Sequence, residues 1–140
     1  MPTLVELVRP WEGRAYRHIP AAAGNDIRDL RYARRRSSGR WHWQGQPTLY
    51  LASSPAVAIS EFARHLALDR GGELVPARRA VYELGVRVDR SVDLRDSRIL
   101  AHIGRDDAPG CWLDERIARA VATFFRDSLA VQALFVPSVA

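Results

Sequence analysis

The 140-residue sequence contains no lysine, only one cysteine and no apolar run long enough to cross a membrane. A single cysteine, Cys111, excludes a disulfide within the chain and is typical of a reducing compartment. No close grouping of cysteine and histidine offers a metal site. Met1–Pro10 lacks a signal-peptide pattern, so we expect a cytoplasmic protein without membrane contact.

All 21 basic residues are arginine, and with 16 acidic residues they leave a net charge of +5. Compositional bias explains the overall count, whereas particular arginines can bind phosphate bidentately with a permanent charge. The run Arg34–Arg36 lies beside two serines and a glycine, which is typical of a solvated loop. No recognised nucleic-acid-binding motif surrounds this run, so direct contact with nucleic acid is not predicted.

Length and a hydrophobic content of 47% predict a single domain over residues 1–140 with its own core. Strict alternation predicts a strand at Arg79–Val88, and Thr3–Val8 could be either strand or helix. Further strands are predicted at Arg14–Ile19, Thr48–Ala52 and Gln132–Val136, and Ser91–Leu94 could continue the sheet. Helices are predicted at Pro55–Leu68, Ser97–Ile103 and Trp112–Arg126. Because strands and helices do not alternate regularly, we expect an α+β fold with a split or mixed sheet.

The stretch Ser38–Glu61 contains the most distinctive local pattern, a turn followed by a strand and a helix. Gly39 permits a tight backbone immediately before Arg40, and Thr48–Ala52 is short and apolar, as in a buried strand. The pattern places Tyr50 near the end of that strand.

A helix start follows directly. Ser54 is a favourable N-cap residue, and Pro55 is favourable at the first helical position. Glu61 then lies about two turns into this helix. The stretch therefore presents an arginine, a tyrosine and a glutamate from three successive elements.

These motifs resemble the RES domain family, which is named for an arginine, a glutamate and a serine. The resemblance rests on Gly-Arg-Trp at 39–41, Leu-Tyr-Leu-Ala at 49–52, Ser-Pro-Ala at 54–56 and Glu61. It extends to Tyr16–Pro20 and to Val136–Ser138, and so covers about Arg14 to Ser138. In two places the chain departs from the family: His42 stands where asparagine is frequent, and the sequence stops two residues after Ser138.

The resemblance implies an ADP-ribosyltransferase-like fold and a bacterial toxin that degrades NAD as its substrate and is restrained by an Xre-type antitoxin. The bond broken would be that between nicotinamide and ribose, with either water or inorganic phosphate as acceptor. A homodimer within a toxin–antitoxin complex is possible in this family. Two alternatives stay open: a binding module that has lost turnover, and an enzyme that transfers ADP-ribose to a macromolecule.

The same resemblance assigns roles to five residues, each of which also has an ordinary structural interpretation. Arg40 would anchor phosphate or ribose, with Arg17 as a second candidate for the phosphates of NAD. Tyr50 would stack on nicotinamide, although a tyrosine in an apolar strand is usually part of the core. Glu61 would stabilise the cationic ribose, and Ser138 would contact the substrate. We expect these side chains to converge on one cleft.

Overall fold

The computed structural model describes residues 2–20, 39–61 and 79–138. The predicted loop at 21–38 and the second half of the predicted helix at Pro55–Leu68 lie outside these ranges. The elements are a 3-10 turn η1 (Val5–Leu7), β1 (Arg9–Pro20), a helix at 55–61, β2 (Arg79–Asp93), α3 (Ser97–His102), a 3-10 turn η2 (Gly110–Leu113), α4 (Glu115–Leu129) and β3 (Ala133–Phe135). No helix in these ranges is both long enough and apolar enough to cross a membrane.

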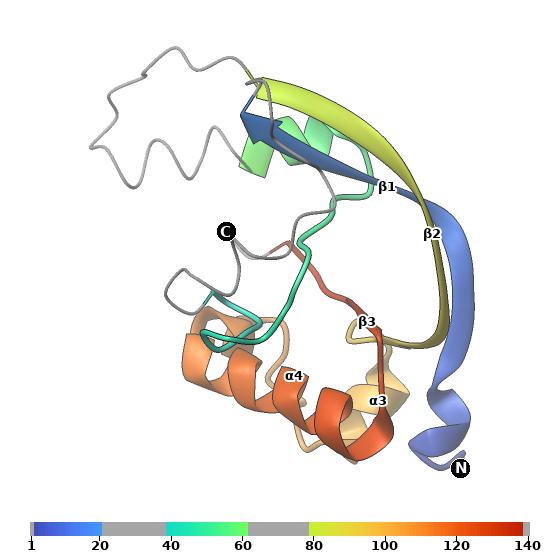
Figure 1. The fold of residues 1–140 in the computed structure, drawn as a ribbon. Coiled ribbons are helices and arrows are strands. Elements are labelled where there is room, and N and C mark those ends of the chain that lie inside the picture. The colour runs from blue at the N-terminus through green and yellow to red at the C-terminus, as the bar shows by residue number, and fades with distance from the viewer. Residues whose placement is uncertain (1, 21–38, 62–78, 139–140) are drawn as a thin grey trace.

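One mixed sheet in the order β1-β2-β3 organises the fold. β1 and β2 pair antiparallel along most of their length, while β3 runs parallel to β2 only at Ser91–Asp93. Figure 1 shows a long, curved ribbon of β1 and β2, with α3, α4 and β3 gathered at one end and the helix at 55–61 beneath the other. The α+β prediction with a mixed sheet is therefore confirmed.

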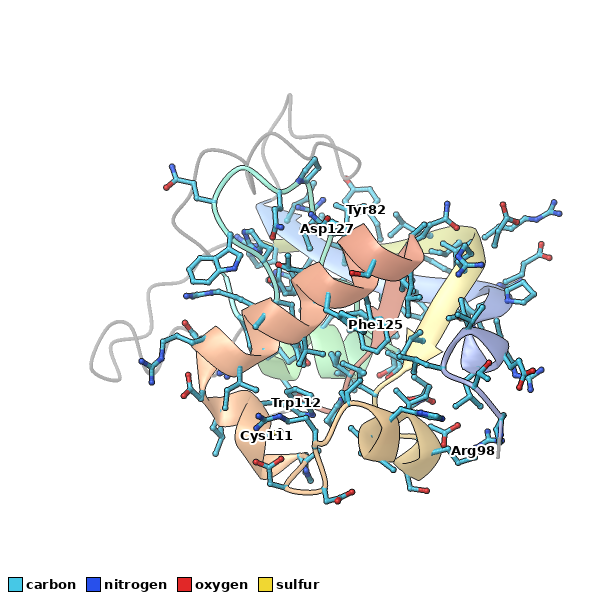
Figure 2. All side chains as sticks on the ribbon, turned by 90° about the horizontal axis from the view of Figure 1, so that it is seen from below. Tyr82, Arg98, Cys111, Trp112, Phe125 and Asp127 are labelled. Atoms are coloured by element: carbon cyan, nitrogen blue, oxygen red, sulfur yellow. The ribbon has the colours of Figure 1, made fainter. Side chains whose placement is uncertain are left out.

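The core lies at the end of the ribbon that carries the helices. Its largest fully buried side chains are Trp112, Phe125, Leu94, Ile99 and Val92. Phe125 and Trp112 (both labelled in Figure 2) come from α4 and from η2 immediately before it. η2 and α4 therefore place the two largest fully buried aromatic side chains in one core cluster with Val92 of β2.

The predicted start of the longest helix is wrong by three residues. The helix begins at Glu115 because Asp114 is its N-cap, accepting a hydrogen bond from the Arg116 amide at 3.0 Å. The residues before it form η2 instead, and Leu113 at the end of η2 is 60% exposed. Within the helix, Phe125 is buried whereas its neighbour Phe124 is exposed.

The predicted strand at Thr48–Ala52 is also wrong. Only Ala52 bonds to the sheet, through two hydrogen bonds with the backbone of Tyr16 at 2.7 and 2.9 Å. Residues 48–51 are extended chain without ladder bonds, and Leu51 is exposed. The short apolar pattern of this segment did not distinguish a full strand from an extended chain in which one residue bonds to the edge of the sheet.

Three half-buried aspartates share one local motif, in which each carboxylate accepts hydrogen bonds from the arginine two residues later. The pairs are Asp93–Arg95, Asp96–Arg98 and Asp114–Arg116. These hydrogen bonds lower the pKa of each aspartate below its usual value. Two of the three aspartates also cap helices, so the carboxylates stabilise the ends of α3 and α4.

We expect this motif to make the fold sensitive to acid. Because the folded-state pKa values lie below the unfolded value of about 3.9, the stabilisation is present above that pH and is lost as pH falls through the folded values. The measurement is the melting temperature between pH 7 and pH 2, with a triple Asp→Asn variant at positions 93, 96 and 114 as comparison. The variant should show a shallower loss below about pH 4; an equal slope would contradict the assignment.

Candidate functional site

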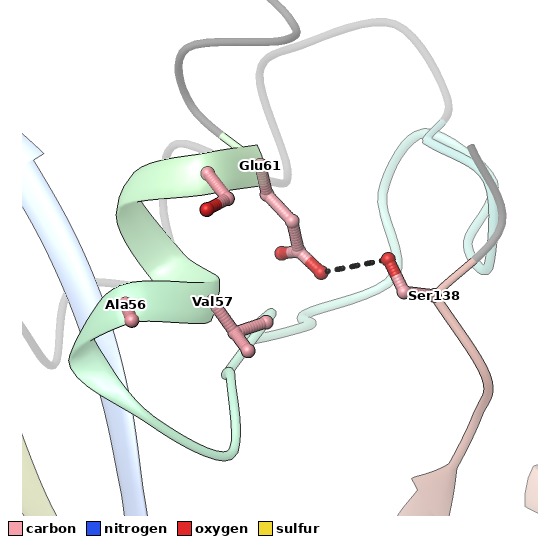
Figure 3. Close-up of a pocket in the computed structure, with 5 residues that line it drawn as sticks. Ala56, Val57, Glu61 and Ser138 are labelled. Carbon is pink, nitrogen blue, oxygen red and sulfur yellow. Dashed lines mark hydrogen bonds between the residues drawn. The ribbon is translucent and has the colours of Figure 1, made fainter.

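The helix at 55–61 carries Glu61 and starts where the sequence predicts. The Ser54 hydroxyl accepts a hydrogen bond from the Val57 amide at 3.1 Å, which confirms Ser54 as N-cap. Pro55 occupies the first helical position, where a missing amide proton costs nothing. This start fixes the phase of the helix, so that Glu61 projects toward the segment that follows β3 (Figure 3).

Glu61 and Ser138 meet although 77 positions separate them in sequence. The Ser138 hydroxyl donates to Glu61 Oε1 at 3.4 Å, as the dashed line in Figure 3 marks. Both residues are exposed, and they line a hollow of about 270 Å³. Its described lining is completed by Ala56, Val57 and Ser60. A carboxylate and a hydroxyl thus share one small open cavity at the end of the sheet.

A second cluster forms around the hydroxyl of Tyr50. The Trp41 amide donates to this oxygen at 3.0 Å, and His42 Nδ1 lies 2.7 Å from it. Burial of the hydroxyl raises the pKa of Tyr50, while the Trp41 hydrogen bond acts in the opposite direction. Tyr50 as a whole is 44% exposed. Tyr50 therefore combines a neutral, fixed hydroxyl with an aromatic face open to solvent.

The tight approach at Gly39 explains why the motif begins with glycine. A Cβ added at Gly39 would lie 2.7 Å from the Tyr50 hydroxyl and 2.6 Å from His42 Cε1. Either distance is shorter than side chains tolerate, so any other residue would disturb the Tyr50–His42 pair. The glycine is required for space beside the second cluster, in agreement with the predicted tight backbone.

We expect Gly39→Ala to lower the free energy of unfolding by about 1–3 kcal/mol, the usual cost of overpacking. Gly110→Ala is the matched control, because an added Cβ there meets no atom within 4 Å. Chemical denaturation of the two variants provides the measurement. Equal stability of both variants would show that the loop relaxes freely around position 39.

Two arginines hold this loop against the helical part of the molecule. Arg40 Nη1 donates to the Trp112 carbonyl at 2.5 Å, and Arg119 Nε donates to the Gly39 carbonyl at 2.6 Å. Trp41 packs against Trp112 with ring centroids 5.2 Å apart. These contacts hold the Gly-Arg-Trp motif between η2 and α4. The hydrogen bond to Trp112 uses one of the five N–H groups of the Arg40 guanidinium.

Arg17 lies in β1 directly opposite Tyr82 of β2. Because strand side chains alternate, Arg17 is on the same face as the buried Ala15 and Ile19. Figure 1 shows the helix at 55–61 beneath this end of the ribbon, so the strand and the helix that carry Arg17 and Glu61 are neighbours.

The structure therefore joins one predicted pair, Glu61 with Ser138. Tyr50 belongs to the second cluster, Arg40 to the adjoining Gly-Arg-Trp loop and Arg17 to β1, whereas Glu61 and Ser138 line the hollow. Convergence of all five side chains remains a prediction.

His42 and Arg119 were not assigned by the sequence pattern. His42 is buried beside Tyr50, and Arg119 also stacks over Trp43, 4.9 Å from the ring centroid. A histidine inside the motif was a signal that could have been used, since it stands next to Arg40 and Trp41. Arg119 carried no local signal, because only the tertiary fold brings α4 to the loop. Across the described ranges, no cluster of histidine, cysteine and carboxylate could hold a metal ion.

Comparison with known proteins agrees with this geometry. The model of the RES domain family matches residues 14–140. A chain of the M. tuberculosis MbcT–MbcA toxin–antitoxin complex superposes with a TM-score of 0.73 at 26% sequence identity, covering 97% of this chain and 76% of that chain. A search of curated proteins gives no significant match. Since the family match spans nearly the whole sequence, including Arg40, Glu61 and Ser138, the chain belongs to the RES domain family.

Proposed function

We propose that this RES domain is an NAD-degrading toxin that cleaves the bond between nicotinamide and ribose. The contact of Glu61 with Ser138 in one hollow carries the proposal, because it assembles the glutamate and serine of the family motif from opposite ends of the chain. Family membership and the likeness to a chain of the MbcT–MbcA toxin–antitoxin complex support the same function.

Cleavage of the bond between nicotinamide and ribose needs little acid catalysis. Nicotinamide is a pyridinium in NAD, so it leaves as a neutral base when it takes the bonding electron pair from the ribose carbon. Positive charge then develops on the ribose as an oxocarbenium ion, and a nearby carboxylate stabilises that charge. Glu61 would fill this role, and the Ser138 hydroxyl, which donates to it, would hold the carboxylate in position or contact the ribose.

The second cluster would bind the rest of the substrate. The exposed ring of Tyr50 offers a face for the nicotinamide, and its fixed hydroxyl limits rotation of the ring. Arg40 retains N–H groups beyond the one that contacts Trp112, and these could bind phosphate. Arg17 would act as a second cation at the phosphates. The proposal includes one further step: bound NAD would contact both the Glu61 hollow and the cluster around Tyr50, and so bring the two together.

Two products are possible from the same cation. Attack by water gives ADP-ribose and a proton, whereas attack by inorganic phosphate gives ADP-ribose phosphorylated at the former nicotinamide position. The assay must therefore be run with and without phosphate. Phosphate-dependent turnover would identify a phosphorylase, and turnover unaffected by phosphate would identify a glycohydrolase.

A toxin of this kind requires restraint by a partner, and we propose an antitoxin of the Xre type. The net charge of +5 favours a partner with carboxylates, since an acidic segment would compete with NAD phosphates for guanidinium groups such as that of Arg40. Charges at the rim of such an interface act mainly on the association rate, so binding should slow as salt increases.

Inducible expression in bacteria tests this function in cells. We expect expression of the chain alone to deplete cellular NAD and stop growth. Co-expression with the neighbouring reading frame of its genome should restore both, while an inactive Glu61→Gln chain should be harmless from the start. Harmless expression of a wild-type chain that degrades NAD rapidly after purification would contradict the need for an antitoxin.

A further inference from the structure

Among the residues that the structure describes, β2 has no strand beside its outer edge before Ser91, and the hydrogen-bond pattern identifies which residues form this edge. Tyr16 uses both its N–H and its C=O to bond Ala52, on the side of β1 that faces away from β2. In an antiparallel ladder, residues opposite each other direct these groups either both inward or both outward. Glu83 is the register partner of Tyr16, so its backbone groups also point away from β1.

The same alternation extends along the strand. Register between Trp11 and Pro20 is regular, so Val81, Gly85 and Arg87 point their backbone groups to the same outer edge as Glu83. Beyond the register shift that follows Val88, Gln132 covers this edge, because its Oε1 accepts hydrogen bonds from the amides of Asp89 and Arg90 at 2.8 and 3.2 Å.

These four residues are exposed, and within residues 2–20, 39–61 and 79–138 no backbone group bonds to theirs on the outer side. β3 covers the edge only from Ser91 onward, and Gln132 covers Asp89 and Arg90. Open strand edges of this length are templates for another strand. An added strand would find its first four partners at Val81, Glu83, Gly85 and Arg87.

We infer that a second copy of the chain occupies this edge, with the two β2 strands antiparallel and related by a two-fold axis at Gly85. The arrangement places Glu83 opposite Arg87 of the second copy, and Arg87 opposite Glu83 of that copy. Opposite charges on directly facing residues stabilise an antiparallel pair, and the two-fold axis produces the contact twice.

The remaining positions fit the same symmetry. Gly85 faces itself at the axis, where a Cβ would meet no atom within 4 Å of its own chain and two glycines leave room for close approach. On the other face of the strand, the half-buried Leu84 lies opposite Val86 of the second copy, so an apolar pair forms on each side of the axis. Outward-directed residues at 83, 85 and 87 exchange backbone hydrogen bonds in this register.

The pairing is limited at both ends. Val81 would face Asp89 of the second copy, whose amide is already bonded to Gln132 within its own chain. A pairing this short buries less area than a typical stable interface. We therefore expect a concentration-dependent dimer. This inference does not depend on the proposed NAD chemistry, because β2 can pair whether or not the hollow is active.

Sedimentation equilibrium of the purified full chain, from about 1 to about 100 µM, measures the association directly. Arg87→Glu should weaken the dimer by about ten- to thirty-fold, since two like-charge contacts replace two opposite-charge contacts. The double variant Glu83→Arg/Arg87→Glu restores opposite charges across the axis and should recover the dimer. Gly85→Pro should abolish it, because proline removes an outward N–H and leaves the bonds to β1 intact.

Melting curves of all four proteins at a low, monomeric concentration provide the control for folding. The symmetric pairing is supported if all four proteins have similar melting temperatures, while Arg87→Glu weakens the dimer and the double variant recovers it. A wild-type chain that stays monomeric throughout the concentration range overturns the inference. The inference is also overturned if the single and the double variant change the dissociation constant of the dimer by the same factor.

Discussion

Replacing Glu61 with glutamine should reduce the rate of NAD breakdown by about 10²–10³-fold, the usual effect of removing one charge-stabilising group from an active site. Glutamine retains the size of the side chain and can still accept a hydrogen bond from Ser138, so only the negative charge is lost. The loss should fall on the chemical step, because a cation exists on the ribose only near the transition state. Single-turnover measurement of nicotinamide release separates this step from substrate binding.

Glu12→Gln is the matched control for the Glu61 variant. Glu12 is an exposed glutamate of β1, far in sequence from the hollow, and the same change there should leave turnover unaltered. Ser138→Ala should give a smaller loss than Glu61→Gln, since the hydroxyl acts on the carboxylate and carries no charge itself. Turnover near the wild-type rate in a folded Glu61→Gln protein would exclude Glu61 from catalysis.

The second large effect concerns Trp112, which links the core to the Gly-Arg-Trp loop. Its side chain is fully buried and packs on Trp41, while its carbonyl accepts the hydrogen bond from Arg40. We expect Trp112→Ala to lower the free energy of unfolding by about 3–5 kcal/mol, as for other buried aromatic residues. Such a loss is a large fraction of the roughly 5–15 kcal/mol that stabilises an ordinary domain.

Urea denaturation measures this difference, and Trp43→Ala provides a control with the same chemical change. Trp43 is 44% exposed, and its contact with Arg119 is of a kind worth about 0.5–1 kcal/mol at exposed sites. We expect the Trp43 variant to remain folded under conditions in which the Trp112 variant unfolds. Comparable losses for both tryptophans would contradict the placement of the core around η2 and α4.

Elements with strong local signals could be predicted from sequence. Strict alternation identified β2, and the Ser54-Pro55 start identified the helix that carries Glu61. The N-terminus of α4 was misplaced because apolar residues at helical spacing continue back to Leu113, whereas the N-cap is Asp114. Residues 48–51 were misassigned because β propensity depends on the neighbouring strands, which the local sequence does not reveal.

In the candidate site too, residues in a local motif could be predicted, whereas contacts that depend on the tertiary fold could not. The motif pointed to Glu61 and Ser138, and the structure brings these two residues into contact from distant parts of the sequence. The clamp that Arg119 places on Gly39 could not be predicted, because it depends on how α4 packs against the loop. Nor could the motif show that the Tyr50 hydroxyl bonds Trp41 and His42, which gives Tyr50 a structural contact beside its proposed role toward NAD.

Incubation of the purified wild-type chain with NAD tests the central claim most directly. Chromatography should show nicotinamide released together with an equal amount of ADP-ribose or its phosphorylated form, and Glu61→Gln should release almost none. NAD labelled in the adenosine portion distinguishes transfer to a macromolecule, because the label would then remain on protein or nucleic acid. A folded wild-type chain that binds NAD but releases no nicotinamide would contradict the account.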